Sequence, residues 1–182
     1  ADEKSRATDD HHGPAETWEC HRDPVDGEDR CPFHLSPDRR RAAGIDDAAL
    51  RDRLLDAVRE GGRRRKQFLG ARLDGLDLSH QVVEGADNHP IDLRYATVDG
   101  AVDVERATVE QSVDLRHANV DAIDGRDAEL ADAWLLDEAT LGAVSLTGTT
   151  FANDLEASGL RVTGETVLDE TRVGGDTCFR GA

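Results

Sequence analysis

Apolar residues in the C-terminal two-thirds of the chain come in pairs separated by one residue, and the pairs recur every five or six residues. The pattern is clearest in an eleven-residue block that occurs three times, beginning at Asp92, Asp103 and Asp114. Each block contains a small residue, then any residue, then an aliphatic residue, as in Ala107-Thr108-Val109. Similar pairs fill most of residues 68–179.

Side chains two apart on an extended backbone point to the same side, so each pair directs both of its members inward. A spacing near five fits neither the 3.6 period of a helix nor the period of two of a flat strand. It predicts a chain that makes a short extended step, turns a corner and steps again, so that stacked coils bury a continuous aliphatic column. We therefore predict an all-β solenoid, a right-handed parallel β-helix, over residues 67–182.

The repeat units resemble the loose A-[D/N]-L-x-x consensus of the pentapeptide-repeat family. The best matches are Gly75-Leu76-Asp77-Leu78-Ser79, Ala118-Asn119-Val120 and Ala128-Glu129-Leu130. The resemblance implies a four-sided, quadrilateral β-helix. Asn88 and Gly125 depart from the pattern where an inward aliphatic residue is expected, and residues 152–164 have no clear register. Six-residue steps, such as that from Val98 to Val104, predict longer corners.

An amphipathic helix is expected within residues 46–66. One face carries apolar side chains, namely Leu50, Leu54, Ala57 and Val58. Asp46 is a suitable N-cap, and Gly61-Gly62 ends the helix. Because a β-helix leaves the end of its apolar column open, we expect this helix to cover that end. Docking to a partner or to a membrane is the alternative.

Arg63-Arg64-Arg65-Lys66 is the densest basic run of the chain. Four adjacent cations are suited to nucleic acid or to an anionic membrane. The run also lies beside a strongly acidic coil, which can neutralise it. We favour a solvated helix end.

Residues 16–45 form a separate segment with too few apolar residues to fold by burial, so a cross-link is expected. Cys31-x-x-His34 can place a thiolate and an imidazole on one ion, and a turn can bring Cys20 to the same ion. Tetrahedral zinc is the metal that such mixed Cys and His ligands fit. The sequence predicts a small zinc knuckle with a structural Zn²⁺.

The fourth ligand of this knuckle is open between His21 and a histidine of the leader, His11 or His12. The leader, residues 1–15, is polar and unpatterned, and we expect it to be flexible. A disulfide between the two cysteines of the knuckle, and inert thiols, are alternatives to a metal. Asp29-Arg30-Cys31-Pro32-Phe33-His34 resembles the short Cys/His module that precedes the repeats in some haloarchaeal pentapeptide-repeat proteins.

The formal charge of -17 is concentrated in the repeats. Residues 1–66 contain 16 acids and 14 bases, a net charge of -2, whereas residues 67–182 contain 23 acids and 8 bases, a net charge of -15. Asp outnumbers Glu by 26 to 13, and Lys4 and Lys66 are the only lysines among 22 basic residues. An acidic surface of this composition is typical of proteins that work in molar salt, and it predicts a halophilic source.

Three residues are candidates for an interaction surface. Trp134, the middle residue of Ala133-Trp134-Leu135, is expected to point outward, and Tyr95 and Arg106 fall on outward corners. No nucleophile with a base, phosphate-binding loop or pair of carboxylates has a specific spacing. Asp residues recur with the repeat and are therefore expected to be structural. We expect no enzymatic activity.

These patterns favour a non-enzymatic protein-interaction or scaffold module with a structural zinc site and a protein partner. The resemblance implies an alternative, a DNA mimic that binds or inhibits a type II topoisomerase, which the rod and its charge also suit. Such inhibitors are usually dimers joined at the C-terminal end of the rod, and the sequence leaves open whether this chain forms a homodimer. Direct binding of nucleic acid is not expected. The chain has no apolar run of membrane-spanning length and no export signal, so we expect a cytoplasmic location.

Overall fold

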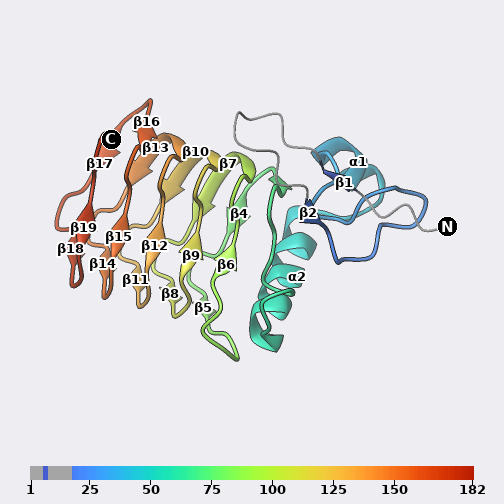
Figure 1. Ribbon diagram of the computed structural model, residues 1–182, viewed down its shortest axis with the longest axis horizontal. Coiled ribbons are helices and arrows are strands. Elements are labelled where there is room, and N and C mark those ends of the chain that lie inside the picture. Colours follow the sequence, from blue (N-terminus) through green and yellow to red (C-terminus); the bar gives the residue numbers. More distant parts are fainter. Residues whose placement is uncertain (1–5, 8–17) are drawn as a thin grey trace.

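The computed structural model describes residues 6–7 and 18–182 (Figure 1). At the N-terminal end, β1 (Arg6–Ala7) pairs antiparallel with β2 (Trp18–Glu19). Helices α1 (Pro37–Ala42) and α2 (Asp47–Glu60) follow. Except for β1, the predicted flexible leader lies outside the described residues, and so do His11 and His12.

Strands β3 to β19 form three parallel sheets. In each sheet, strands from successive turns lie side by side along one axis, which confirms the predicted β-solenoid (Figure 1). The seven-stranded sheet contains β3 (Arg72–Leu73), β4 (Leu76–Asp77), β7 (Thr97–Asp103), β10 (Asn119–Asp124), β13 (Thr140–Ser145), β16 (Arg161–Val162) and β17 (Thr166–Val167). One five-stranded sheet contains β5 (Val82–Val83), β8 (Thr108–Val109), β11 (Glu129–Leu130), β14 (Thr150–Phe151) and β18 (Arg172–Val173). The other contains β6 (Ile91–Asp92), β9 (Val113–Asp114), β12 (Trp134–Leu135), β15 (Leu155–Glu156) and β19 (Thr177–Cys178).

The seven-stranded sheet is bent and supplies two walls. Strands β3 and β4 pair with the first and second halves of β7, and the register shifts by one residue between the two halves. Together with the two five-stranded sheets, this arrangement is compatible with the four-sided β-helix that the resemblance implies. Successive turns approach closely at the bend, where a Cβ on Gly142 would collide with the carbonyl oxygen of Asp121.

One turn of the solenoid takes 21 or 22 residues, because Thr97 pairs with Asn119 and Asn119 pairs with Thr140. The first turn is longer: Val82 pairs with Thr108, 26 residues later. The extra residues belong to a loop over positions 84–90, which leaves the walls and returns at β6. Asn88, which broke the sequence repeat, is an exposed residue of this loop rather than a column residue.

Two corners of each turn are β-turns whose third residue has a positive φ. In one of them, Ala96 N–H donates to the Leu93 carbonyl at 3.1 Å and Tyr95 has a φ of 59°. A bond from residue i+3 to residue i with φ > 0 at i+2 defines a type II turn. The positive-φ residues stack into a first corner column, Gly70, Tyr95, His117, Glu138, Gly159 and Gly181, and a second corner column, His80, Arg106, Asp127, Gly148 and Glu170.

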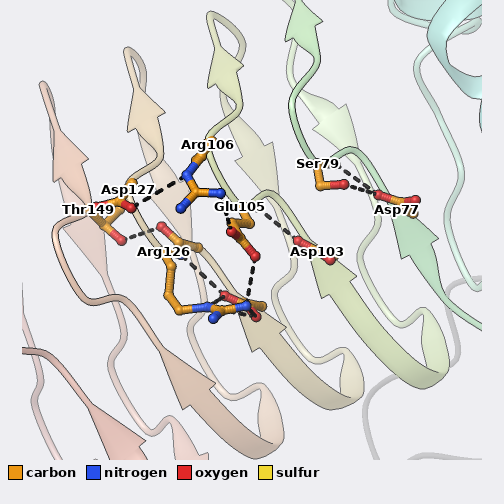
Figure 2. Close-up of polar contacts among 10 residues, drawn as sticks. Asp77, Ser79, Asp103, Glu105, Arg106, Arg126, Asp127 and Thr149 are labelled. Atoms are coloured by element: carbon orange, nitrogen blue, oxygen red, sulfur yellow. Dashed lines mark hydrogen bonds and ion pairs between the residues drawn. The ribbon is translucent and has the colours of Figure 1, made fainter.

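Aspartates brace the strand ends that precede the corners. Asp77, Asp103 and Asp124 each accept a hydrogen bond from the backbone N–H two residues later, and each lies directly before a turn of the second corner column (Figure 2). This local bond competes with continuation of the strand and favours a turn. Asp92, Asp103 and Asp114, the aspartates of the sequence repeat, all accept this bond before a corner turn, and Asp92 and Asp114 are buried.

The column between the walls is filled by the predicted inward pairs, including Ala107 and Val109. The prediction for Trp134 was wrong. Trp134 is only 2% exposed, and it pairs with Val113, which also points inward. The inward residues of this coil are Trp134 and Leu136 rather than Ala133 and Leu135, because the preceding corner is one residue longer than the pair spacing suggested.

Helix α2 covers the first turn of the column, as predicted (Figure 1). Asp46 caps it by accepting from Ala49 N–H at 2.8 Å, and Gly61 ends it with a φ of 69°. Its buried face consists of Leu50, Leu54, Leu55 and Val58. Helix α1 was not predicted, although Ser36 followed by Pro37 is a helix-start signal. Among the described residues, no helix is long and apolar enough to cross a membrane.

Candidate metal centre

A tight turn places Cys31 and His34 on one side of the backbone. The N–H groups of His34 and Leu35 donate to the Cys31 carbonyl at 3.0 and 3.2 Å. This turn brings Cys31 Sγ to 3.1 Å from His34 Nδ1. The spacing of the Cys31-x-x-His34 motif thus gives the geometry that the sequence predicted.

Cys20 reaches the same point from the end of β2. Its sulfur lies 3.4 Å from the sulfur of Cys31, and the donor atoms of Cys20, Cys31 and His34 all lie within 4.8 Å of one another. Two sulfurs bound tetrahedrally to one zinc at about 2.3 Å are about 3.8 Å apart. A small outward shift of the two thiols would therefore fit zinc.

The second ring nitrogen of His34 fixes the tautomer that a metal requires. His34 Nε2 lies 2.8 Å from the carbonyl oxygen of Leu69. A carbonyl oxygen only accepts, so Nε2 carries the proton and Nδ1 presents its lone pair toward the cysteines. Backbone carbonyls orient metal-bound histidines in this way. Because Leu69 belongs to the first corner turn, the same hydrogen bond connects the centre to the solenoid.

The three donors differ in their exposure. Cys31 is 1% exposed and His34 is 4% exposed, and Cys31 belongs to the apolar cluster that continues into the column. Cys20 is half-buried. The centre is therefore built into the base of the cap and is open to solvent on the side of Cys20.

The two thiols share their protons unequally. The pKa of Cys20 is lowered to about 4 by its side-chain hydrogen bond with Cys31, while burial acts in the opposite direction. The pKa of Cys31 is raised, because its proton is held in the hydrogen bond with Cys20 and because burial disfavours its thiolate. One thiolate forms easily, and the second requires a cation, which a coordinated metal provides.

Arg22 joins the centre to the first turn. Its guanidinium carbon lies 4.2 Å from the centre of the Phe68 ring and 5.0 Å from that of Phe33, and the two rings pack edge to face at 4.7 Å. The same group donates to the carbonyls of Arg65 and Gln67. Burial lowers the pKa of Arg22, and the neighbouring thiolates act to raise it. This role could not be predicted from the sequence, since Arg22 belongs to no motif.

His21 is not part of this cluster. Its side chain is exposed, and the donor atoms that the described residues bring together belong to Cys20, Cys31 and His34 alone. Consecutive residues at the end of a strand project in different directions, which explains why Cys20 points inward and His21 does not. The predicted use of His21 as fourth ligand has no support in this geometry.

Two further buried cations hold the cap on the solenoid. Arg40, fully buried, donates to the Arg72 carbonyl at 2.6 Å and to Asp74 at 3.1 Å. Lys66 is also fully buried, so the basic run is a solvated helix end only at its three arginines. Neither role could be predicted, because nothing in the sequence around Arg40 or Lys66 distinguishes them from exposed cations.

Lys66 is bound by the loop over positions 84–90. Its Nζ donates to the carbonyls of Asp87 and His89 at 2.8 and 3.0 Å and also to the side-chain oxygen of Gln111, and it lies 2.7 Å from the Asp87 carboxylate. All of its donors are satisfied, which is the condition for a buried ammonium group.

The predicted interaction residues do not form one surface. Trp134 is buried against Phe151, with ring centres 6.2 Å apart. Tyr95 lies in the first corner column and stacks on His117 at 4.8 Å with an angle of 5° between the rings. Arg106 lies in the second corner column, where it pairs with Glu105 at 2.9 Å and with Asp127 at 3.7 Å (Figure 2).

Comparison with known proteins found no matching family model, no similar curated protein and no similar solved structure. The turn length and the four walls are compatible with the pentapeptide-repeat fold.

Proposed function

We propose that the chain is a non-enzymatic interaction or scaffold module, in which a rigid solenoid presents its walls to a protein partner and a structural zinc ion holds the N-terminal cap. The cluster of Cys20, Cys31 and His34 carries this proposal. Its donor atoms lie within 4.8 Å of one another at the base of the cap. The bond from His34 to Leu69 and the contacts of Arg22 connect the cluster to the first turn.

The zinc content of the purified protein tests the metal part of the proposal. We expect about one zinc per chain, the stoichiometry of a mononuclear structural site. Cys31→Ser should abolish zinc binding. Cys178→Ser is the matched control, because Cys178 lies in the last strand, β19, and should leave the zinc content unchanged. Equal zinc content in the two variants would contradict the proposal.

The two corner columns offer a test of the partner-binding part. Two variants are compared: the double substitution Tyr95→Ser and His117→Ser in the first corner column, and the single substitution Arg106→Ser in the second. In an extract prepared in molar potassium chloride, the immobilised chain should retain a partner protein that one variant loses and the other keeps. Each variant is the control for the other, since they alter different corners of the same folded rod. Retention that neither variant changes would exclude both corner columns as the contact.

A DNA mimic that binds a type II topoisomerase is a second proposal, favoured by the net charge of -15 over residues 67–182. Arginines neutralise part of this acidic charge: Arg94, Arg116 and Arg126 pair with Asp92, Asp114 and Asp124 at 2.9, 2.7 and 2.7 Å. A supercoiling assay distinguishes the two functions. Inhibition that is lost on reversing charges at Asp103 and Asp124 would support the mimic, and the absence of inhibition would exclude it.

A further inference from the structure

We infer that Cys20 and Cys31 form an oxidation-sensitive pair, whose disulfide expels the metal. The consequence for the metal rests on the proposed zinc centre. Formation of the disulfide depends only on the two thiols.

The geometry brings the two sulfurs close to bonding distance. They are 3.4 Å apart, and a disulfide bond is about 2.05 Å long. The cysteines are eleven residues apart, and the loop between them contains Gly27 with a φ of 79° and exposed residues on both sides of it. The remaining approach can therefore occur by movement of this loop, while Cys31 stays in the apolar cluster.

The difference in exposure sets the order of events. Cys20 is half-buried, whereas Cys31 is 1% exposed. An oxidant in solution meets Cys20 first, and Cys31 lies behind it, within reach of the oxidised sulfur. An accessible thiol next to a second cysteine that can resolve it is the arrangement of redox-sensitive pairs.

Hydrogen peroxide is the oxidant class that fits this order. The Cys20 thiolate attacks one peroxide oxygen, the O–O bond breaks, and the products are a sulfenic acid on Cys20 and hydroxide. The Cys31 thiolate then attacks the Cys20 sulfur and displaces a second hydroxide as the S–S bond forms. Two thiolates lose two electrons, peroxide gains them, and two protons from solvent convert both hydroxides to water.

The same reaction removes two of the three protein ligands of the metal. Thiolates bind zinc, whereas disulfide sulfurs are no longer anionic, so only His34 remains as a ligand. The zinc ion leaves with its charge of +2, balancing the two thiolate charges consumed. Without the metal, the hydrogen bond from His34 to Leu69 and the contacts of Arg22 remain as connections between this centre and the first turn.

The test uses the full chain carrying Cys178→Ser, so that Cys20 and Cys31 are the only thiols. Zinc-loaded protein is titrated with hydrogen peroxide, released zinc is measured with a chromogenic chelator, and the oxidation state is read from peptide masses. We expect one disulfide for each zinc released, and recovery of zinc binding after a dithiol reductant. Adding Cys20→Ser should abolish the disulfide.

Two results would overturn the inference: both thiols still alkylate after exposure to peroxide, or zinc is lost with sulfinic acids and no disulfide. The same masses are measured on protein prepared without zinc. Protein that takes up no zinc yet forms the Cys20–Cys31 disulfide would contradict the proposed metal centre and leave the thiol pair standing, so the two failures are distinguishable.

Discussion

Three cationic side chains connect the cap to the solenoid, of which Arg40 and Lys66 are fully buried and Arg22 is half-buried. Arg22, Arg40 and Lys66 all come from the N-terminal segments, and each donates to backbone carbonyls of the first turn or of its loop. The first turn of a solenoid presents unpaired carbonyl groups at its edge, and such groups cost free energy when they are buried without a donor. Long cationic side chains satisfy several carbonyls at once, which a helix packed by apolar contacts alone cannot do.

Replacement of Lys66 tests this role. Lys66→Met should lower the free energy of unfolding by about 3 kcal/mol, because it leaves the Asp87 carboxylate without its cation and two carbonyls without their donor. Arg63→Met is the control, since Arg63 is exposed and such substitutions usually change stability by about 0.5 kcal/mol or less. Urea denaturation measures both. Equal midpoints for the two variants would mean that Lys66 does not hold the loop.

The same contact predicts a pH dependence. Hydrogen bonds from Lys66 and then from Gly62 N–H hold the pKa of Asp87 below its usual value of 3.8. A depressed pKa in the folded state stabilises the protein above the unfolded value, and this stabilisation is lost as the pH falls through the depressed value.

Asp87→Asn removes the titrating group. Its deficit in urea midpoint relative to the parent should be constant above about pH 5 and shrink below about pH 4. His89 Nδ1 lies 3.3 Å from the Asp87 carboxylate, so both proteins carry His89→Gln to exclude its titration. A deficit that stays constant down to about pH 2.5 would contradict the assignment.

At the scale of the elements, the strands of two residues are too short to be stable alone, and the corner turns fix their register. Each type II turn sets the direction of the next wall, and its aspartate or positive-φ residue lies directly over the one in the turn before. Non-glycine residues in this conformation carry a local cost, which the stacked column outweighs. Stability therefore comes from neighbouring turns rather than from any single repeat.

Substitutions at two neighbouring positions, one in the corner before β8 and one in β8 itself, test which side chains point into the column and which point outward. Ala107→Arg should lower the free energy of unfolding by more than about 4 kcal/mol, because it places an unpaired charge in the column. Thr108→Arg, one residue later, puts the same side chain on the outer wall and should cost less than about 1 kcal/mol. Thermal denaturation compares them, and equal losses would show that the register is wrong.

The sequence was sufficient to predict the walls of the solenoid but not the lengths of all the corners between them. Alternation identified Ala107 and Val109 as inward residues, because each inward pair is flanked by polar neighbours. It failed at Trp134, where Ala133, Leu135 and Leu136 are also apolar and two registers look alike. Counting 21 residues from Val113 instead of following the local pairs would have placed Trp134 inward.

In the metal centre, too, residues close in sequence could be predicted and contacts between distant segments could not. Cys31 and His34 could be predicted because three residues of separation places both in one turn, and Cys20 because it is a cysteine nearby in the sequence. The contacts of Arg22 with Phe33 and Phe68 could not, because they depend on how the cap meets a turn that begins more than forty residues later. Contacts between segments leave no periodic signal in a single sequence.

At the scale of the whole molecule, we expect the rod to loosen first at its N-terminal end. Removal of zinc should raise hydrogen exchange at the amides of the first turn, such as Phe68 and Gly70, which bond to the next turn at 2.7 and 2.8 Å. Amides of the last turns, such as Gly174, serve as the internal control. An equal rise at both ends would indicate global destabilisation rather than release of the cap.

The central claim is that Cys20, Cys31 and His34 hold one zinc ion at the junction of cap and solenoid. X-ray absorption at the zinc K-edge tests it most directly on the zinc-loaded protein. We expect two sulfur ligands at about 2.3 Å and at least one imidazole nitrogen at about 2.0 Å, with one sulfur lost in Cys20→Ser. A zinc ion surrounded only by oxygen and nitrogen, unchanged by Cys20→Ser, would contradict it.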